Sequence, residues 1–172
     1  MCPRPRRNID VEEVLATVPL MLAELAQVSD LGGKEGGMFC LMEESTGNLV
    51  IEPTEIGKIT NGKKDKYREY CLEKATRLRS HRGEDHFLSW QSRDENHDMW
   101  GGAFSDGDHI WSLSGYTEEQ DEALMIMSAH VCGRIMNIEP RDCAKVSDNR
   151  IILDNEYLFW IPKETFPDEE EE

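Results

Sequence analysis

The chain has 172 residues, of which 38% are hydrophobic, so it can bury the core of one ordinary domain. Its 35 acidic and 19 basic residues give a formal net charge of −16. This charge argues against nucleic acid or an anionic membrane surface as partner, because the phosphates would repel the chain.

The first predicted element is an amphipathic helix over residues 11–26, where apolar residues recur at three- and four-residue spacing. Asp10 can cap this helix, and Glu13 stands where a capping box needs an acid. Pro19 lies inside the pattern and lacks a backbone donor. The helix is therefore expected either to kink at Pro19 or to restart there.

Two strands and a second helix follow. The continuous apolar run Met38–Met42 predicts a buried strand, and Leu49–Ile51 predicts the strand that returns from a turn. Residues 53–62 are rich in turn formers and predict a loop. Residues 63–80 carry apolar side chains on one face and charged side chains elsewhere, which predicts a helix.

The second half of the chain predicts further strands and a central helix. Residues 87–90 are apolar enough for a short strand, and residues 93–98 are charged and predict a loop. Residues 108–114 alternate in the manner of a strand. Thr117 is a good cap for a helix that is apolar almost all round from Ala123 to Met136, so we expect that helix to be central and buried.

The C-terminal segment predicts a hairpin. Residues 150–153 and 157–161 are apolar runs on either side of the turn-forming residues 154–156. The last six residues, 167–172, are mostly acidic, so we expect a solvated, disordered tail.

These elements predict an α/β (α+β) fold with a mostly antiparallel sheet of about five strands covered by helices, plus the C-terminal hairpin. We expect three parts: a domain over residues 1–137, a hairpin extension over 138–166 that packs on it, and the acidic tail over 167–172. No apolar run reaches the roughly 18 residues that a membrane span needs.

The five cysteines are irregularly spaced and include no C-x-x-C pair, which argues against both a disulfide framework and a zinc site. Reduced thiols are the simplest interpretation, and they predict a cytoplasmic location.

Four motifs in the second half resemble the GlcG-like family, also called haem-binding-protein-S-like, which includes the C-terminal domain of the propanediol-utilisation protein O. The motifs are Gly101-Gly102, Asp106-Gly107-Asp108, Ser114-Gly115 and the helix start Thr117–Ala123. The resemblance covers residues 9–137. It implies a profilin-like fold, homo-oligomers, and binding of small ligands such as haem or a corrinoid.

The candidate ligand-binding residues are His81, His86, Trp100, Gly101 and Gly102. The two histidines flank the end of the second predicted helix and could offer imidazole to haem. In the family, the glycine pair borders the ligand pocket, and Trp100 could form an apolar wall. The alternative is that these are ordinary surface histidines, a core aromatic and a conformational glycine pair.

The sequence contains no evident catalytic set: no H-E-x-x-H, no phosphate-binding loop and no G-x-S-x-G. We therefore expect a non-catalytic protein that binds haem or another tetrapyrrole or corrinoid, with no metal site assigned. The main alternative is an interaction or scaffold module without a cofactor, for which Phe159 and Trp160 would supply an apolar surface. Enzymatic breakdown of haem would need an iron ligand that the sequence does not identify.

Overall fold

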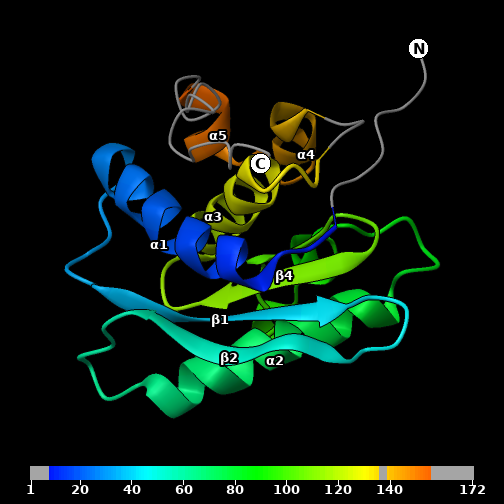
Figure 1. The fold of residues 1–172 in the computed structure, drawn as a ribbon, viewed down its shortest axis with the longest axis horizontal. Helices are drawn as coiled ribbons and strands as arrows, with labels where there is room; N and C mark the ends of the chain where they lie inside the picture. Colours follow the sequence, from blue (N-terminus) through cyan, green and yellow to red (C-terminus); the bar gives the residue numbers. More distant parts are fainter. Residues whose placement is uncertain (1–7, 136–138, 156–172) are drawn as a thin grey trace, which may run out of the picture.

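The structure is a computed structural model, which describes residues 8–135 and 139–155. It contains an antiparallel sheet of four strands in the order β2-β1-β4-β3, with helices on both faces (Figure 1). The strands are β1 (Gly36–Glu43), β2 (Leu49–Gly57), β3 (Ala103–Ser105) and β4 (His109–Ser114). The helices are α1 (Val11–Val28), α2 (Lys64–Ser80), α3 (Glu118–Val131), α4 (Pro140–Ser147) and α5 (Arg150–Asp154).

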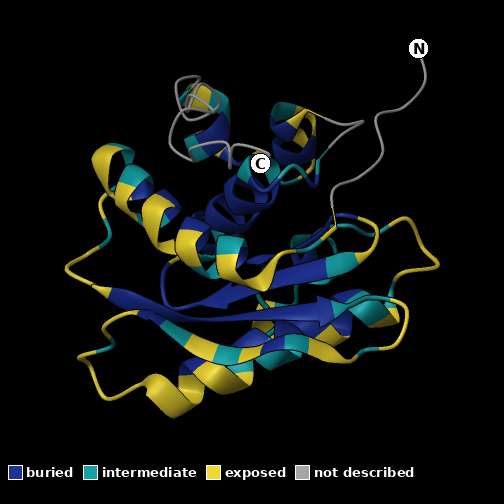
Figure 2. Cartoon of the chain, viewed as in Figure 1, coloured by how far each residue is buried: buried dark blue, intermediate teal, exposed yellow. Residues whose placement is uncertain are grey.

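The two central strands, β1 and β4, are buried on both faces (Figure 2). Phe39 and Leu41 of β1 face the larger core cluster, beneath α1 and α3. Met38 and Cys40 point to the opposite face, where they pack with residues of α2. This double burial explains why β1 is a continuous apolar run instead of an alternating one.

Most of the predicted elements are confirmed. The side chain of Asp10 caps α1 by accepting hydrogen bonds from the backbone N–H groups of Glu12 and Glu13. The helix runs through Pro19 without a break, so the restart is excluded. Thr117 and Gln120 form the predicted capping box of α3.

The strand count is four instead of about five. The segment predicted as a strand at residues 87–90 contributes only an isolated bridge from Leu88 to Phe104, followed by a 3-10 turn over Ser89–Ser92. Conversely, β2 continues through Pro53 to Gly57, where a loop was expected. Proline is tolerated there because β2 is an edge strand, so one side of its backbone needs no partner.

The expected C-terminal hairpin is wrong in its first strand, because residues 150–154 form the short helix α5. Asn149 caps α5, and Ile152 is fully buried in the larger core cluster. The expected second strand and the acidic tail lie outside the described residues. The central helix α3 also ends earlier than predicted, at Val131, since Gly133 adopts a left-handed conformation that stops it.

Among the helices of the described segments, none is both long and apolar enough to cross a membrane.

Candidate functional site

A pocket of about 420 Å³ opens where the start of α2 meets the loop between β4 and α3. The α1–β1 loop and the segment before β3 complete its wall. Its cationic and aromatic lining residues are Lys34, Lys63, Lys66, Lys74, Tyr67, Tyr70, Trp100 and Tyr116. Of the five candidate residues from the sequence, only Trp100 is in this lining.

One face of α2 supplies one side of the wall, where lining residues recur at three- and four-residue spacing from Lys63 to Lys74. Lysines at this end oppose the helix dipole, whose N-terminus is positive. Lys63 is the N-cap residue, and its side chain makes no capping hydrogen bond. Helix stability alone therefore gives no reason for lysine at Lys63 or Lys66.

The two carboxylates in the lining, those of Glu118 and Asp121, each form an ion pair with a basic side chain. Glu118 pairs with Arg93 at 2.9 Å and also accepts a hydrogen bond from the backbone N–H of Gly101. Asp121 pairs with Lys74 at 3.0 Å. Neither carboxylate forms an ion pair with Lys34, Lys63 or Lys66 among the described residues.

Lys34, Lys63 and Lys66 are exposed, and no carboxylate of the described residues lies within ion-pair distance of them. Lys66 instead lies over the ring of Tyr70, with 5.4 Å from Nζ to the ring centroid. The pocket therefore presents unpaired positive charge, although the whole chain carries a net charge of −16.

The glycine pair Gly101-Gly102 lies behind three of the lining side chains, those of Lys74, Glu118 and Asp121. Gly102 has φ +117°, and a Cβ there would lie 2.8 Å from Lys74 Nζ and 2.7 Å from Asp121 Cβ. The Lys74–Asp121 pair is buried, with side chains only 4% and 2% exposed. Burial raises the pKa of Asp121, and Lys74 acts in the opposite direction. Gly102 thus leaves the room that this pair needs, which is a structural reason for the glycine.

Trp100 is held in the wall by its own backbone. Its carbonyl oxygen accepts a hydrogen bond of 2.5 Å from the guanidinium of Arg77, which also donates to the Ser89 carbonyl at 2.7 Å. Arg77 is buried and is oriented by Glu73 one helical turn away. The Trp100 backbone is therefore fixed relative to α2 by a buried cation.

Tyr116 contributes a hydroxyl that has no hydrogen-bond partner among the described residues. The residue is only 8% exposed, and burial, followed by the charge of Asp121, raises its pKa to about 12. The hydroxyl therefore stays neutral, and it is a buried hydrogen-bond donor without an acceptor among the described residues.

His81 and His86 do not lie in this pocket. His81 follows the last residue of α2, whereas Lys66 is in its first turn. At 1.5 Å per residue, these positions are roughly 22 Å apart along the helix axis. The two histidines therefore lie far from the lysines at the start of α2, whereas the Trp100 backbone lies against Arg77, near the same end of the helix as His81.

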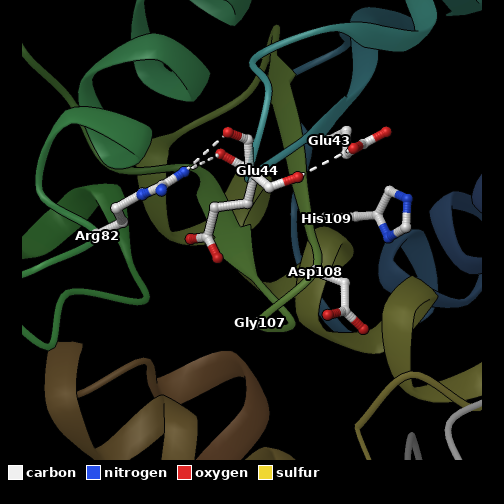
Figure 3. A pocket seen from close by; sticks show the side chains of 7 residues that line it. Glu43, Glu44, Arg82, Gly107, Asp108 and His109 are labelled. Atoms are coloured by element: carbon white, nitrogen blue, oxygen red, sulfur yellow. Dashed lines mark hydrogen bonds between the residues drawn. The ribbon is translucent and has the colours of Figure 1, made fainter.

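A second pocket, of about 490 Å³, lies at the other end of the sheet between the β1–β2 and β3–β4 turns (Figure 3). Its polar groups bond to each other and to neighbouring residues: Arg82 donates to the carbonyl oxygens of Glu44 and Ser45 at 2.8 and 3.1 Å. Asp108 pairs with Arg134 at 2.9 Å. Arg82 thus holds the β1–β2 turn and Arg134 the β3–β4 turn, and the two turns are joined by a hydrogen bond of 2.9 Å from the backbone N–H of Glu44 to the carbonyl oxygen of Asp108.

Comparisons with protein-family models, with curated proteins and with solved structures found no match to the chain.

Sequence reasoning missed the lysines, because they come from separate segments that only the fold brings together. One signal was present: the helix predicted over residues 63–80 begins with Lys63, Lys64 and Lys66, where acidic residues are favoured. Lys64 is accounted for by its ion pair with Glu55 at 2.8 Å. Lys63 and Lys66 have no such ion pair among the described residues, and both line the pocket.

Proposed function

We propose that the protein is a non-catalytic small-ligand-binding protein whose pocket at the start of α2 takes an anionic ligand with a flat ring system. The observation that carries this proposal is the group of three lysines without carboxylate partners, Lys34, Lys63 and Lys66, beside aromatic side chains. Ammonium groups bind carboxylates and phosphates through charge-assisted hydrogen bonds. The volume lies within the range of about 300–1,000 Å³ that is usual for small-ligand sites.

The remaining lining supports the same ligand chemistry. Trp100 and Tyr70 offer ring faces for stacking, and the hydroxyl of Tyr116 offers a hydrogen bond. The first turn of α3 adds the positive end of a helix dipole. The lining residues include no histidine or cysteine, so the pocket lacks a nucleophile–imidazole pair, which favours binding without catalysis.

A tetrapyrrole with carboxylate side chains belongs to this ligand class, but the described lining offers haem iron no histidine, cysteine or methionine. Iron in haem proteins is held by histidine, cysteinate, methionine or tyrosinate. The described lining residues include no histidine, cysteine or methionine; of the lining tyrosines Tyr67, Tyr70 and Tyr116, the raised pKa of Tyr116 disfavours its phenolate. We therefore propose recognition through the ligand's carboxylates and ring, without an iron ligand from the protein.

We further propose a profilin-like, GlcG-like architecture for the chain and a cytoplasmic, homo-oligomeric protein. The antiparallel sheet with helices on both faces supports the architecture. Cys40, Cys71 and Cys143 are buried and form no disulfide, which suits a reducing compartment. The oligomer rests on the family resemblance alone.

The test is a titration of the purified protein with protoporphyrin IX and, in parallel, with haemin, followed by tryptophan quenching and the Soret band. We expect saturation near one equivalent with both ligands, weaker binding at higher ionic strength, and little binding of protoporphyrin dimethyl ester. The double variant Lys63→Gln/Lys66→Gln should weaken protoporphyrin binding about tenfold, which corresponds to about 1.4 kcal/mol.

Lys64→Gln is the matched control, because Lys64 is an exposed lysine of the same helical turn that lies outside the lining. It should leave the affinity nearly unchanged. Absence of saturable binding, or an equal loss in the control and the double variant, would refute the proposal.

The alternative of a scaffold without a ligand rested on Phe159 and Trp160. Both lie outside the described residues, so no structural observation favours it.

A further inference from the structure

We propose that His81, Glu84 and His86 form a binding site for a divalent transition-metal ion, separate from the pocket at the start of α2. One imidazole nitrogen of each histidine and one carboxylate oxygen of Glu84 lie within 4.8 Å of one another. Among the described residues, no other group of three or more histidine, cysteine or acidic side chains brings its ligand atoms close enough together to hold an ion.

The turn after α2 brings the three side chains together. His81 ends the helix, and its carbonyl oxygen accepts a hydrogen bond of 2.9 Å from the backbone N–H of Glu84. Asp85 then takes a left-handed conformation, with φ +57°, which turns the chain back and places His86 beside His81. The two imidazole rings stack with centroids 4.9 Å apart and planes inclined by 24°.

Both ends of this turn are anchored. His81 is attached to the last turn of a 17-residue helix. On the other side, the carbonyl oxygen of Phe87 accepts a hydrogen bond of 2.8 Å from the backbone N–H of Ser105, and Leu88 bridges to Phe104. Two imidazoles on a helix end and at a sheet edge are positioned more rigidly than two on a free loop.

One of the two histidines has a hydrogen-bond partner at Nδ1 and the other has none among the described residues. Nδ1 of His81 contacts the carboxylate of Glu84. Nδ1 of His86 is buried and has no hydrogen-bond partner among the described residues. An ion at the nitrogen edges of the two rings, where the lone pairs lie in the ring planes, would take the carboxylate and one nitrogen from each imidazole.

The three ligand atoms need to approach each other only modestly to reach the bond lengths of a small ion. Zinc binds histidine nitrogen at about 2.0–2.1 Å and carboxylate oxygen at about 2.0–2.2 Å, so tetrahedral ligand atoms lie roughly 3.4 Å apart. The side chain of Glu84 is 62% exposed, and its carboxylate already contacts Nδ1 of His81. Two imidazoles and one carboxylate select Zn²⁺, Ni²⁺, Cu²⁺ or Fe²⁺ over Ca²⁺ and Mg²⁺, which prefer oxygen ligands.

Calorimetric titration of the full chain with ZnCl₂ tests the site, with MgCl₂ as a second titrant. We expect one equivalent of Zn²⁺ to bind and Mg²⁺ not to bind. His86→Gln should weaken Zn²⁺ binding roughly 30-fold or more, as for other losses of coordination. Glu84→Gln, at an exposed position where folding is not at risk, should weaken it in the same direction.

His97→Gln is the matched control. Like His81, His97 contacts an acid three residues away, at 2.6 Å from Nδ1 to the Asp94 carboxylate, but it is more exposed and is not part of a group that could hold an ion. This variant should bind Zn²⁺ as the parent chain does.

Imidazole ¹H–¹⁵N spectra provide a second measurement, in which Zn²⁺ should shift the ring signals of His81 and His86 and leave those of His97 in place. The proposal is overturned if Zn²⁺ does not bind, if His86→Gln and Glu84→Gln both bind it with parental affinity, or if the shifted signals belong to other histidines.

Discussion

At the scale of single residues, the buried pair of Lys74 and Asp121 connects the fold to the candidate pocket. Lys74 also donates to the carbonyl oxygen of Leu113 at 2.8 Å, and Asp121 accepts from the backbone N–H of Tyr116 at 3.1 Å. The pair therefore ties α2 and α3 to the end of β4, where the pocket opens. Such a pair is costly to break, because removing one partner leaves the other charge buried and uncompensated.

We predict that Lys74→Met destabilises the protein by about 3–5 kcal/mol, measured by urea unfolding. The double variant Lys74→Met/Asp121→Asn should recover roughly 2 kcal/mol of this, since an asparagine keeps an acceptor for Tyr116 without a charge. Lys145→Met removes one partner of an exposed pair with Asp142, and it should cost less than about 1 kcal/mol. A Lys74 variant no less stable than the Lys145 variant would contradict the role assigned to the buried pair.

At the scale of elements, α3 is joined to α4 and α5 through a second buried acid. Glu122 lies in α3, is only 2% exposed, and accepts hydrogen bonds from Ser147 and, at 2.8 Å, from Asn149. Its other carboxylate oxygen has no partner among the described residues. Burial raises its pKa from 4.5 to about 7, although both hydrogen bonds act in the opposite direction.

This raised pKa predicts how stability depends on pH. Between about pH 4.5 and pH 7, the folded state keeps a proton on Glu122 that the unfolded state has lost. The contribution of Glu122 to stability therefore falls as pH rises through this window, by up to about 3 kcal/mol. Urea unfolding at pH 5, 6, 7 and 8 should show Glu122→Gln gaining stability over the parent chain towards pH 8. The difference between the two chains removes the shared effect of other groups.

Glu69→Gln, at an exposed position on α2, is the control for this experiment and should follow the pH curve of the parent chain. If the stability difference between the Glu122→Gln variant and the parent chain were independent of pH, Glu122 would not be the titrating group.

The elements that the sequence predicted well are those whose own pattern determines them. The Thr117–Gln120 capping box locates the start of α3, and the apolar run Met38–Met42 locates β1. The prediction of a strand over residues 150–153 was wrong because a run of four apolar or long side chains fits a strand and a helix equally. The helix is selected by the Asn149 cap and by contacts with α3, which residue spacing does not reveal.

The candidate site was predictable only in part, for a similar reason. Trp100 was identified because an aromatic beside a glycine pair is visible in one short stretch of sequence. Lys34 and Lys63 are far apart in the chain, and their approach depends on how α1, α2 and β1 pack. That His81 and His86 lie outside the lining that contains Trp100 was also not visible in the sequence, because the lining depends on how α2 packs against the sheet.

At the scale of the whole molecule, residues 139–155 belong to the main core. Ile152, Cys143 and Ala144 are buried in the same cluster as residues of α1, α3 and the sheet. Figure 1 shows α4 and α5 stacked on the side of α3 away from the sheet. This packing makes α3 a central helix, buried from more than one side, and it accounts for the apolar character of α3 almost all round.

If the segment is part of one core, a cavity in α5 should weaken the whole protein. Ile152→Ala should cost about 2–5 kcal/mol and lower a single cooperative transition, with near- and far-UV circular dichroism following the same urea midpoint. Val146→Ala, at a position in α4 that is 38% exposed, should cost less than about 1 kcal/mol. A separable extension would behave differently: Ile152→Ala would then produce an early transition of small amplitude and leave the main midpoint in place. A shift of the main midpoint makes α3, with α4 and α5 on one side and the sheet on the other, the centre of a single folding unit.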